Sequence, residues 1–289
     1  MPENTLPIRV NIVAYNEALF IEECLNSIKL ALELACHSDA VVSIIANGCS
    51  DNTYEIAKSY CKQLATWTAY ELPLGDKANA WNYAITLDDA SGKSLSIFVD
   101  GDCTIAEQSI ISLLNTYQSS PAAYAIAGVP GTKGNTTETT IKRTLAGDAL
   151  SGNFYALTPN FLNKVASQQF RLPVGLIGDD SLLAWVASHD FKLSNGVVSG
   201  YLVGSAGADF FYHRLTPDSL HNIRLYIRRI HRYSLRHLQQ SCIREYLNQV
   251  NDFNQLPPNI SEIYQYKKAK HIRSNSLYGM FDVINYCLI

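Results

Sequence analysis

Two acidic residues stand together behind one of the most apolar stretches of the sequence. Ser96-Ile97-Phe98-Val99 has the β-branched and aromatic composition of a buried strand, and Asp100-Gly101-Asp102 follows it directly. In open α/β sheets ligands bind outside the carboxyl ends of the strands, and hard divalent cations prefer carboxylate oxygens together with water and substrate phosphates. The pair therefore indicates a site for a metal ion and a diphosphate. An ordinary turn is the alternative, because Asp and Gly both favour tight reversals of the chain.

A second acidic pair, Asp179-Asp180, follows the loop formed by residues 173–178. The apolar spacing of Leu182, Leu183 and Val186 predicts a helix that these two acids begin. Acidic residues also stabilise a helix amino terminus through the helix dipole, by about 0.3–1 kcal/mol each. Position alone therefore leaves open whether the pair does chemistry or only supports the helix.

The elements that must position these acids alternate between strands and helices. Strands are predicted over residues 8–14, 41–45, 66–72 and 96–99, and amphipathic helices follow each of the first three. This alternation predicts an α/β fold with a mainly parallel, doubly wound sheet. Three more polar residues follow the first three strands and share the same predicted edge, although each could also be a surface charge or a turn residue. They are Glu17, Asn47 and Lys77.

The composition is that of a globular protein, because 289 residues of which 47% are apolar support a sizeable core. The seven cysteines are scattered and include no Cys-x-x-Cys pair, which predicts reduced thiols and argues against a structural zinc. The amino terminus has no basic region before an apolar segment, and no run of about 18 apolar residues occurs. We therefore expect no signal peptide, no membrane span and a cytoplasmic location.

Several common nucleotide and metal motifs are missing. Gly92-Lys93-Ser94 resembles part of a phosphate loop, but the position five before Gly92 is Leu87 and not glycine. Glycines 128, 131 and 134 are spaced by three, so they do not form the Gly-x-Gly-x-x-Gly of a dinucleotide site, and no His-Glu-x-x-His occurs. These patterns argue against a P-loop NTPase, a nicotinamide dehydrogenase and a zinc hydrolase. The Gly- and Thr-rich residues 128–137 instead predict a mobile connection that could cover the site as a lid.

The last quarter of the chain differs in charge from the rest. Residues 213–289 carry 11 Lys and Arg against 5 Asp and Glu, whereas residues 1–212 carry 12 against 21. Such a basic segment can be solvated, pair with the acidic part of the chain, contact an anionic membrane surface or hold a phosphate-bearing acceptor. From Pro217 onward the spacing predicts a helix with basic residues at every fourth position. These are Arg224, Arg228, Arg232 and Arg236.

Taken in order, five short motifs resemble the signature of the family 2 glycosyltransferases, which have the GT-A fold. The resemblance covers residues 8–215 and rests on the order and spacing of the motifs. The motifs are Tyr15-Asn16-Glu17, Asn47-Gly48-Cys49-Ser50-Asp51-Asn52-Thr53, Gly75-Asp76-Lys77-Ala78-Asn79-Ala80-Trp81-Asn82, Val99-Asp100-Gly101-Asp102 and Gly178-Asp179-Asp180.

The resemblance implies a nucleotide-sugar donor, a divalent cation (Mn²⁺ or Mg²⁺) and inversion at the anomeric carbon. It implies that Glu17, Asn47 and Lys77 bind the donor. It also implies that Asp100 and Asp102 flank a metal-bound diphosphate.

Two further roles follow from the same resemblance. A carboxylate must take the proton of the acceptor hydroxyl, and Asp180 matches the acid that ends the family's acidic pair, with Asp179 as the runner-up. His213 is a candidate metal ligand, because a late residue completes the metal shell in many GT-A enzymes. A lone histidine beside aromatic residues is otherwise a packing or capping residue.

Departures from the family pattern bear on the substrates. Ala46 stands where the family usually has an acid, so one expected contact to the donor base is absent and the base stays open. The resemblance still makes a UDP-sugar the first candidate donor. Residues 225–230 lack the Trp of the Gln-x-x-Arg-Trp motif found in members that make long polymers. Since no membrane span is expected either, the chain is predicted to add one sugar and not to polymerise.

We therefore expect an inverting, metal-dependent glycosyltransferase that adds one sugar to a glycan, lipid-linked or small acceptor. Residues 1–215 would form the catalytic domain and residues 216–289 a basic helical extension. Peripheral membrane contact through the arginine face is left open, and no nucleic-acid partner is expected. The alternatives are a non-catalytic module of the same fold that binds nucleotide sugars or glycans, and a nucleotidyltransferase.

Overall fold

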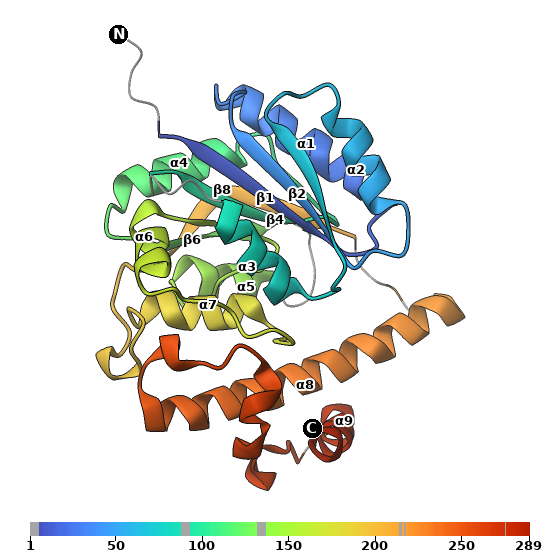
Figure 1. Cartoon of the computed structure of the whole chain (residues 1–289), viewed down its shortest axis with the longest axis vertical. Coiled ribbons are helices and arrows are strands. Elements are labelled where there is room, and N and C mark those ends of the chain that lie inside the picture. Colours follow the sequence, from blue (N-terminus) through green and yellow to red (C-terminus); the bar gives the residue numbers. More distant parts are fainter. Residues whose placement is uncertain (1–5, 88–92, 132–136, 214–215, 217, 275) are drawn as a thin grey trace.

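A computed structural model shows how these elements are arranged in space (Figure 1). The structure describes residues 6–87, 93–131, 137–213, 216, 218–274 and 276–289. The strands are β1 (Ile8–Ala14), β2 (Val41–Asn47), β3 (Trp67–Leu72), β4 (Leu95–Asp100), β5 (Cys103–Ile105), β6 (Ala125–Pro130), β7 (Phe154–Leu157) and β8 (Leu202–Tyr212).

The α-helices are α1 (Ile21–Leu34), α2 (Thr53–Cys61), α3 (Lys77–Leu87), α4 (Ser109–Ser119), α5 (Thr137–Leu145), α6 (Pro159–Ser167), α7 (Asp179–Ser188), α8 (Leu220–Val250) and α9 (Ser276–Leu288). Short 3₁₀ turns lie at Leu193–Asn195, Phe253–Gln255, Ile260–Tyr266 and Ala269–His271. The four predicted strands and the helices after the first three are thus confirmed.

All of these strands belong to one sheet with the order β3-β2-β1-β4-β7-β6-β8-β5. The first four strands run parallel, as the alternation of strands and helices predicts. Beyond β4 the sheet is mixed, because β7 runs antiparallel to both of its neighbours and β5 runs antiparallel to β8. The predicted α/β class is confirmed, and the parallel part is the half that carries the first polar loops.

The register brings the ends of three strands to one edge of the sheet. Val13 of β1 pairs with Asp100 of β4, and Ala14 pairs with Ala46 of β2. Because these strands are parallel, the loops that follow them all leave the sheet on the same side. Residues far apart in the sequence therefore meet at this edge.

Helices cover both faces of the sheet (Figure 1). On one face α1, α2 and α4 pack against the strands, and α1 buries Ile21, Leu25 and Ile28 at the spacing of a single helix face. Burying side chains of this size stabilises the fold by about 1.5–3 kcal/mol each. On the other face α3, α6, α7 and the second half of α8 share one core, to which Ile243 and Leu247 belong.

The prediction of a mobile connection over residues 128–137 is wrong for the part that the structure describes. Residues 128–130 belong to the buried strand β6, and Thr137 begins α5, while residues 132–136 lie outside the described residues. Gly128 serves close packing, because a Cβ there would lie 2.4 Å from Cδ1 of Phe154 on β7. A glycine that lets two strands approach was mistaken for a loop residue.

All seven cysteines lie in the described part of the chain, and each is a free thiol. Within that part no helix is both long enough and apolar enough to cross a membrane.

Candidate active site

Lys77, the first residue of α3, connects the two acidic pairs of the sequence. Its Nζ lies 2.6 Å from Asp100 Oδ1 and 3.8 Å from Asp179 Oδ2, and it donates a hydrogen bond to the carbonyl of Gly152. Burial disfavours a charge on this amine, but Asp100 and Asp179 raise the pKa of Lys77 above its usual 10.5. Lys77 is therefore a charged bridge within the site.

Asp100 ends β4 and is largely covered. Burial raises the pKa of its carboxyl to about 7, against the pull of Lys77, and Asp102 adds to the rise. The side-chain amide of Asn153 donates a hydrogen bond of 3.3 Å to Asp100 Oδ2. Asp100 is thus fixed by an amine and an amide, which leaves Asp102 as the freer member of the pair.

Glu17 lies in the loop after β1 and shares the electrostatic environment of the acidic pair. Burial, together with the charges of Asp102, Asp100 and Asp51, raises its pKa to about 8. The mutual repulsion of these carboxylates shows that this edge of the sheet holds more negative charge than Lys77 alone balances.

Asn47 holds the sheet edge together. Its side chain is buried, and its amide nitrogen donates a hydrogen bond of 2.7 Å to the carbonyl of Ala14. This bond joins the ends of β1 and β2, so the amide nitrogen faces the protein backbone.

The acids that begin α7 have different surroundings. Asp179 is 5% exposed, and its Oδ2 has no hydrogen-bond donor within the described residues, although Lys77 lies 3.8 Å away. Asp180 Oδ1 instead lies 3.0 Å from Arg236 Nη2, and its side chain lines a cavity. Burial raises the pKa of Asp180, Arg236 opposes this shift, and Asp179 adds to it. Asp180 is therefore the member of the pair that a bound molecule can reach.

Arg236 comes from α8 and lies across the start of α7. It also donates a hydrogen bond to Ser181 Oγ, so its guanidinium contacts two successive residues of α7. Gly178 makes room for it, because a Cβ at this residue would lie 2.4 Å from Arg236 Nε. Gly178 also has a φ of +92°, which favours glycine.

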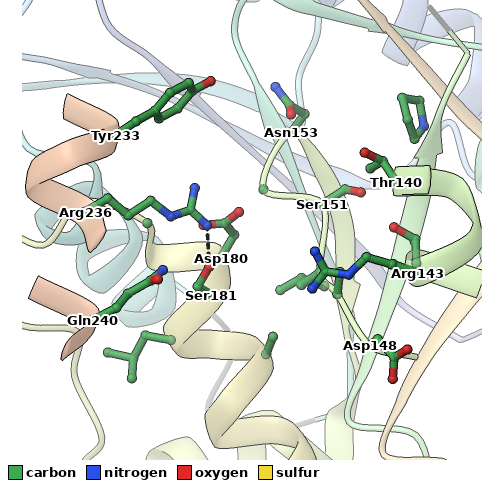
Figure 2. Close-up of a pocket in the computed structure, with 18 of the residues that line it drawn as sticks. Thr140, Arg143, Asp148, Ser151, Asn153, Asp180, Ser181, Tyr233, Arg236 and Gln240 are labelled. Carbon is green, nitrogen blue, oxygen red and sulfur yellow. Dashed lines mark hydrogen bonds and ion pairs between the residues drawn. The ribbon is translucent and has the colours of Figure 1, made fainter. Parts of the chain in front are cut away.

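The cavity in front of Asp180 has a volume of about 860 Å³, which lies within the range of small-molecule sites. Asp102, Asn153 and His213 line it together with Asp180. Figure 2 shows Asp180 and Arg236 reaching into it from α7 and α8, and Arg143 of α5 on the opposite side. The cavity thus extends from Asp102, the second acid after β4, to Asp180 at the start of α7.

Comparison with known families decides what kind of protein has this arrangement. Residues 10–172 match the sequence profile of the family described as "Glycosyl transferase family 2". The chain belongs to this family. The prediction of a glycosyltransferase is confirmed, and the match spans both the acidic pair after β4 and all of the earlier loops.

Solved structures with similar folds agree with the assignment of the GT-A fold. The mannosyltransferase PcManGT from Pyrobaculum calidifontis, solved with GDP-Man and Mn²⁺, has a TM-score of 0.61 at 16% identity, over 99% of this chain and 75% of that one. Residues 1–349 of TarS from S. aureus, solved with UDP-GlcNAc, have a TM-score of 0.53 at 15% identity, over 97% and 89%. No curated protein sequence matches the chain.

In this family 2 glycosyltransferase, Asp102 and His213 follow the same end of the β5–β8 ladder. Cys103 pairs with Tyr212 at the end of the β5–β8 ladder, so the residues next along the two strands are Asp102 and His213, and both line the cavity. The His213 ring stacks on Phe20 with 4.5 Å between ring centroids, and its Nε2 lies 3.6 Å from Glu23 Oε2.

The donor atoms at this point fit a hard divalent cation. Within the described residues no group of three or more His, Cys, Asp and Glu side chains is placed so that it could hold a metal ion by itself. Carboxylate oxygens and one imidazole nitrogen match a cation that takes its remaining ligands from water and substrate phosphates. The excess of negative charge around Glu17 and Asp100 also favours a cation here.

The structure thus divides the predicted site residues into two sets. Three of them line the cavity, and the other five lie behind its wall or at the sheet edge. The lining set is Asp102, Asp180 and His213, and the second set is Glu17, Asn47, Lys77, Asp100 and Asp179.

Sequence analysis missed the roles of Asn153 and Arg236. Asn153 sits in the turn before β7 with no motif around it. Arg236 was recognised as one of the regularly spaced arginines, and its pairing with the acidic part of the chain was one of the alternatives. The helical period gives the face on which Arg236 lies but not the element packed against that face.

Proposed function

We propose that this glycosyltransferase moves one sugar from a nucleotide-diphosphate sugar to a hydroxyl of a glycan, lipid-linked or small acceptor. The transfer inverts the anomeric centre and uses a divalent cation. The observation that carries the proposal is that Asp102 and Asp180 line the same cavity of about 860 Å³. The acid suited to the donor diphosphate and the acid suited to the acceptor hydroxyl therefore face the same space, in which donor and acceptor would bind together.

Asp180 acts as the general base in this proposal. The acceptor oxygen forms a bond to the anomeric carbon while the bond from that carbon to the diphosphate oxygen breaks, and Asp180 takes the hydroxyl proton. Because the acceptor attacks from the side opposite the leaving group, the configuration inverts. Arg236, 3.0 Å from Asp180, favours the ionised carboxylate that this step requires.

Asp102 and His213 would hold the cation. When bound, the cation supplies positive charge that neutralises the leaving diphosphate. Mn²⁺ and Mg²⁺ are both candidates, since the solved mannosyltransferase was studied with Mn²⁺ and the donor atoms here suit either ion.

The remaining predicted residues would shape the donor side. Lys77 fixes Asp100 and lies where the diphosphate meets the sheet edge, and Glu17 lies among the same charges. Asn47 would act by holding the ends of β1 and β2 in register. Ala46 is fully buried at this edge and offers no polar group to a base, so the donor base stays open and both UDP-sugars and GDP-sugars are to be tested.

We propose that residues 216–289 work as an extension of a catalytic domain formed by residues 1–215. The second half of α8 shares the core of that domain, and Arg236 reaches its proposed base. The first half of α8 keeps Arg224, Arg228 and Arg232 exposed, which suits peripheral contact of a cytoplasmic enzyme with an anionic membrane.

Release of nucleotide diphosphate tests the proposal. The protein is incubated with UDP-glucose, UDP-N-acetylglucosamine and GDP-mannose, each with Mn²⁺, Mg²⁺ or EDTA, and the released UDP or GDP is measured. We expect slow metal-dependent release into water from one donor. Tight donor binding without any turnover, even with added acceptors, would favour a binding module instead. Release of pyrophosphate from a nucleoside triphosphate would favour a nucleotidyltransferase.

A further inference from the structure

The wall of the cavity away from the acidic pair is formed by α5, α7 and α8, and it is rich in arginine. Arg143 of α5, Arg229 and Arg244 of α8 line the cavity in addition to Arg236. These helices come from distant parts of the chain, and Figure 2 shows Arg143 facing the cavity from the side opposite Arg236. The arginines therefore surround the space in front of Asp180.

Arg236 differs from the other three in its partners. Its charge is balanced by Asp180 at 3.0 Å. Within the part of the chain that the structure describes, no carboxylate lies within 4.0 Å of the guanidinium nitrogens of Arg143, Arg229 or Arg244. Asp148 is the remaining acidic side chain on this wall, so the wall keeps a net positive charge.

Aromatic side chains stand beside these arginines. The guanidinium of Arg244 lies 5.1 Å from the ring centroid of Trp185, and that of Arg229 lies 6.0 Å from the ring centroid of Tyr233. Trp185 belongs to α7, the helix that presents Asp180, and both aromatic residues line the cavity. Flat aromatic surfaces with polar edges suit the packing of a sugar ring.

We propose that the acceptor is an anionic saccharide, whose phosphate or carboxylate is bound by Arg143 and Arg244 while one of its hydroxyls reaches Asp180. Arginine presents a fork of donors that matches both anions, and a cavity wall of one charge sign concentrates oppositely charged ligands. This assignment rests on the proposed function, because it places the acceptor by the role of Asp180. In this arrangement the donor binds at the acidic end of the cavity, beside Asp102.

Calorimetric titration of the whole protein tests the assignment. Glucose 6-phosphate, glucuronate and glucose are titrated into protein that already holds UDP and Mn²⁺. We expect glucose 6-phosphate, glucuronate or both to bind at least ~10-fold more tightly than glucose, and added NaCl to weaken that binding. The tighter of the two anions then distinguishes a phosphate from a carboxylate acceptor.

Variants locate the binding. Arg143→Gln and Arg244→Gln are each expected to weaken binding of the preferred anion by ~3–10-fold, with UDP binding unchanged. Arg171→Gln is the control, because Arg171 is exposed outside the cavity and, among the described residues, donates to the carbonyl of Phe170 alone. Circular dichroism and the melting temperature show whether each variant folds.

Four results would overturn the assignment. If glucose binds as tightly as both anions, the negative charge of the acceptor contributes nothing to binding. If UDP displaces the anion, the anion occupies the donor site and not an acceptor site. Geranyl phosphate binding as tightly as glucose 6-phosphate would assign the anion to a lipid carrier and not to a sugar. Failure of anion binding with intact donor turnover rejects this inference alone, whereas absent donor turnover with intact anion binding rejects the proposed function.

Discussion

Arg236 Nη2 on α8 lies 3.0 Å from Asp180 Oδ1 at the start of α7. The contact joins the basic carboxyl-terminal segment to the acid that we propose as the catalytic base. An arginine at this distance favours the carboxylate over the neutral acid, and burial alone would do the opposite. Helix α8 is therefore part of the proposed chemistry as well as of the core.

Replacement of the base should affect turnover and spare donor binding. We expect Asp180→Asn to lower the transfer rate by ~10²–10⁴-fold while the dissociation constant of the donor changes little, because the amide cannot accept the hydroxyl proton. Steady-state kinetics and calorimetry with UDP separate the two effects. Asp179→Asn is the matched neighbour, and a larger rate loss in that variant would exchange the roles of the two acids.

Removal of the metal-facing charge should affect the donor. We expect Asp102→Asn to weaken Mn²⁺-dependent donor binding by at least ~10-fold, because a carboxylate ligand is replaced by a neutral one. Titration of the donor with Mn²⁺ and with EDTA measures the change. An Asp102→Asn protein with the metal dependence of the unaltered protein would contradict the assignment.

The pH profile should depend on Arg236. Burial raises the pKa of Asp180 above its usual 3.8, so the transfer rate should fall as the pH drops through that raised pKa and the carboxylate becomes protonated. Arg236 opposes the rise, so Arg236→Gln should move the acid limb of the rate profile to higher pH. Arg236→Lys keeps a positive charge and should restore the limb in part. A lower melting temperature with an unmoved acid limb would leave Arg236 a purely structural role.

The exposed arginines of α8 should promote contact with anionic lipid. We expect the triple variant Arg224→Gln, Arg228→Gln, Arg232→Gln to lose binding to vesicles that contain phosphatidylserine, since each basic residue near such a surface contributes about 1 kcal/mol. The loss is measured by sedimentation with two kinds of vesicle, one of phosphatidylcholine alone and one that also contains about 30% phosphatidylserine. The matched variant replaces Lys29 of α1, Lys58 of α2 and Lys62, the residue directly after α2, with Gln. Equal losses in both triple variants would indicate that vesicle binding depends on the net charge of the protein and not on the exposed arginines of α8.

Two tryptophans, Trp81 and Trp185, should behave differently. Trp81 is 1% exposed and packs against Phe98 and Phe170, so Trp81→Ala should lower the free energy of unfolding by about 3–5 kcal/mol. Trp185 is only partly buried and lines the cavity, so Trp185→Ala should cost less stability. Urea unfolding of both variants provides the comparison. Equal destabilisation would place Trp185 in the core as well.

Much of the architecture could be predicted because its signals are local. Apolar runs at residues 8–14 and 95–99 form buried strands wherever they lie, and parallel strands must end at a common edge. That rule brings the loops of Glu17 and Asp100 together before any coordinates are known. Gly128 shows the limit of local signals, because the same residue type serves a loop and a close strand contact, and only Phe154 on the neighbouring strand decides between them.

The sequence by itself determined the residue types at this sheet edge and their order, and so the family and the reaction class. The tertiary structure decided which acid faces the cavity, since Asp179 and Asp180 are adjacent and differ only in what packs against them. It also decided that Arg236 serves Asp180 while Arg224 stays exposed on the same helix. A helical period fixes the angle between side chains, but the partner of each face depends on packing between segments far apart in the chain.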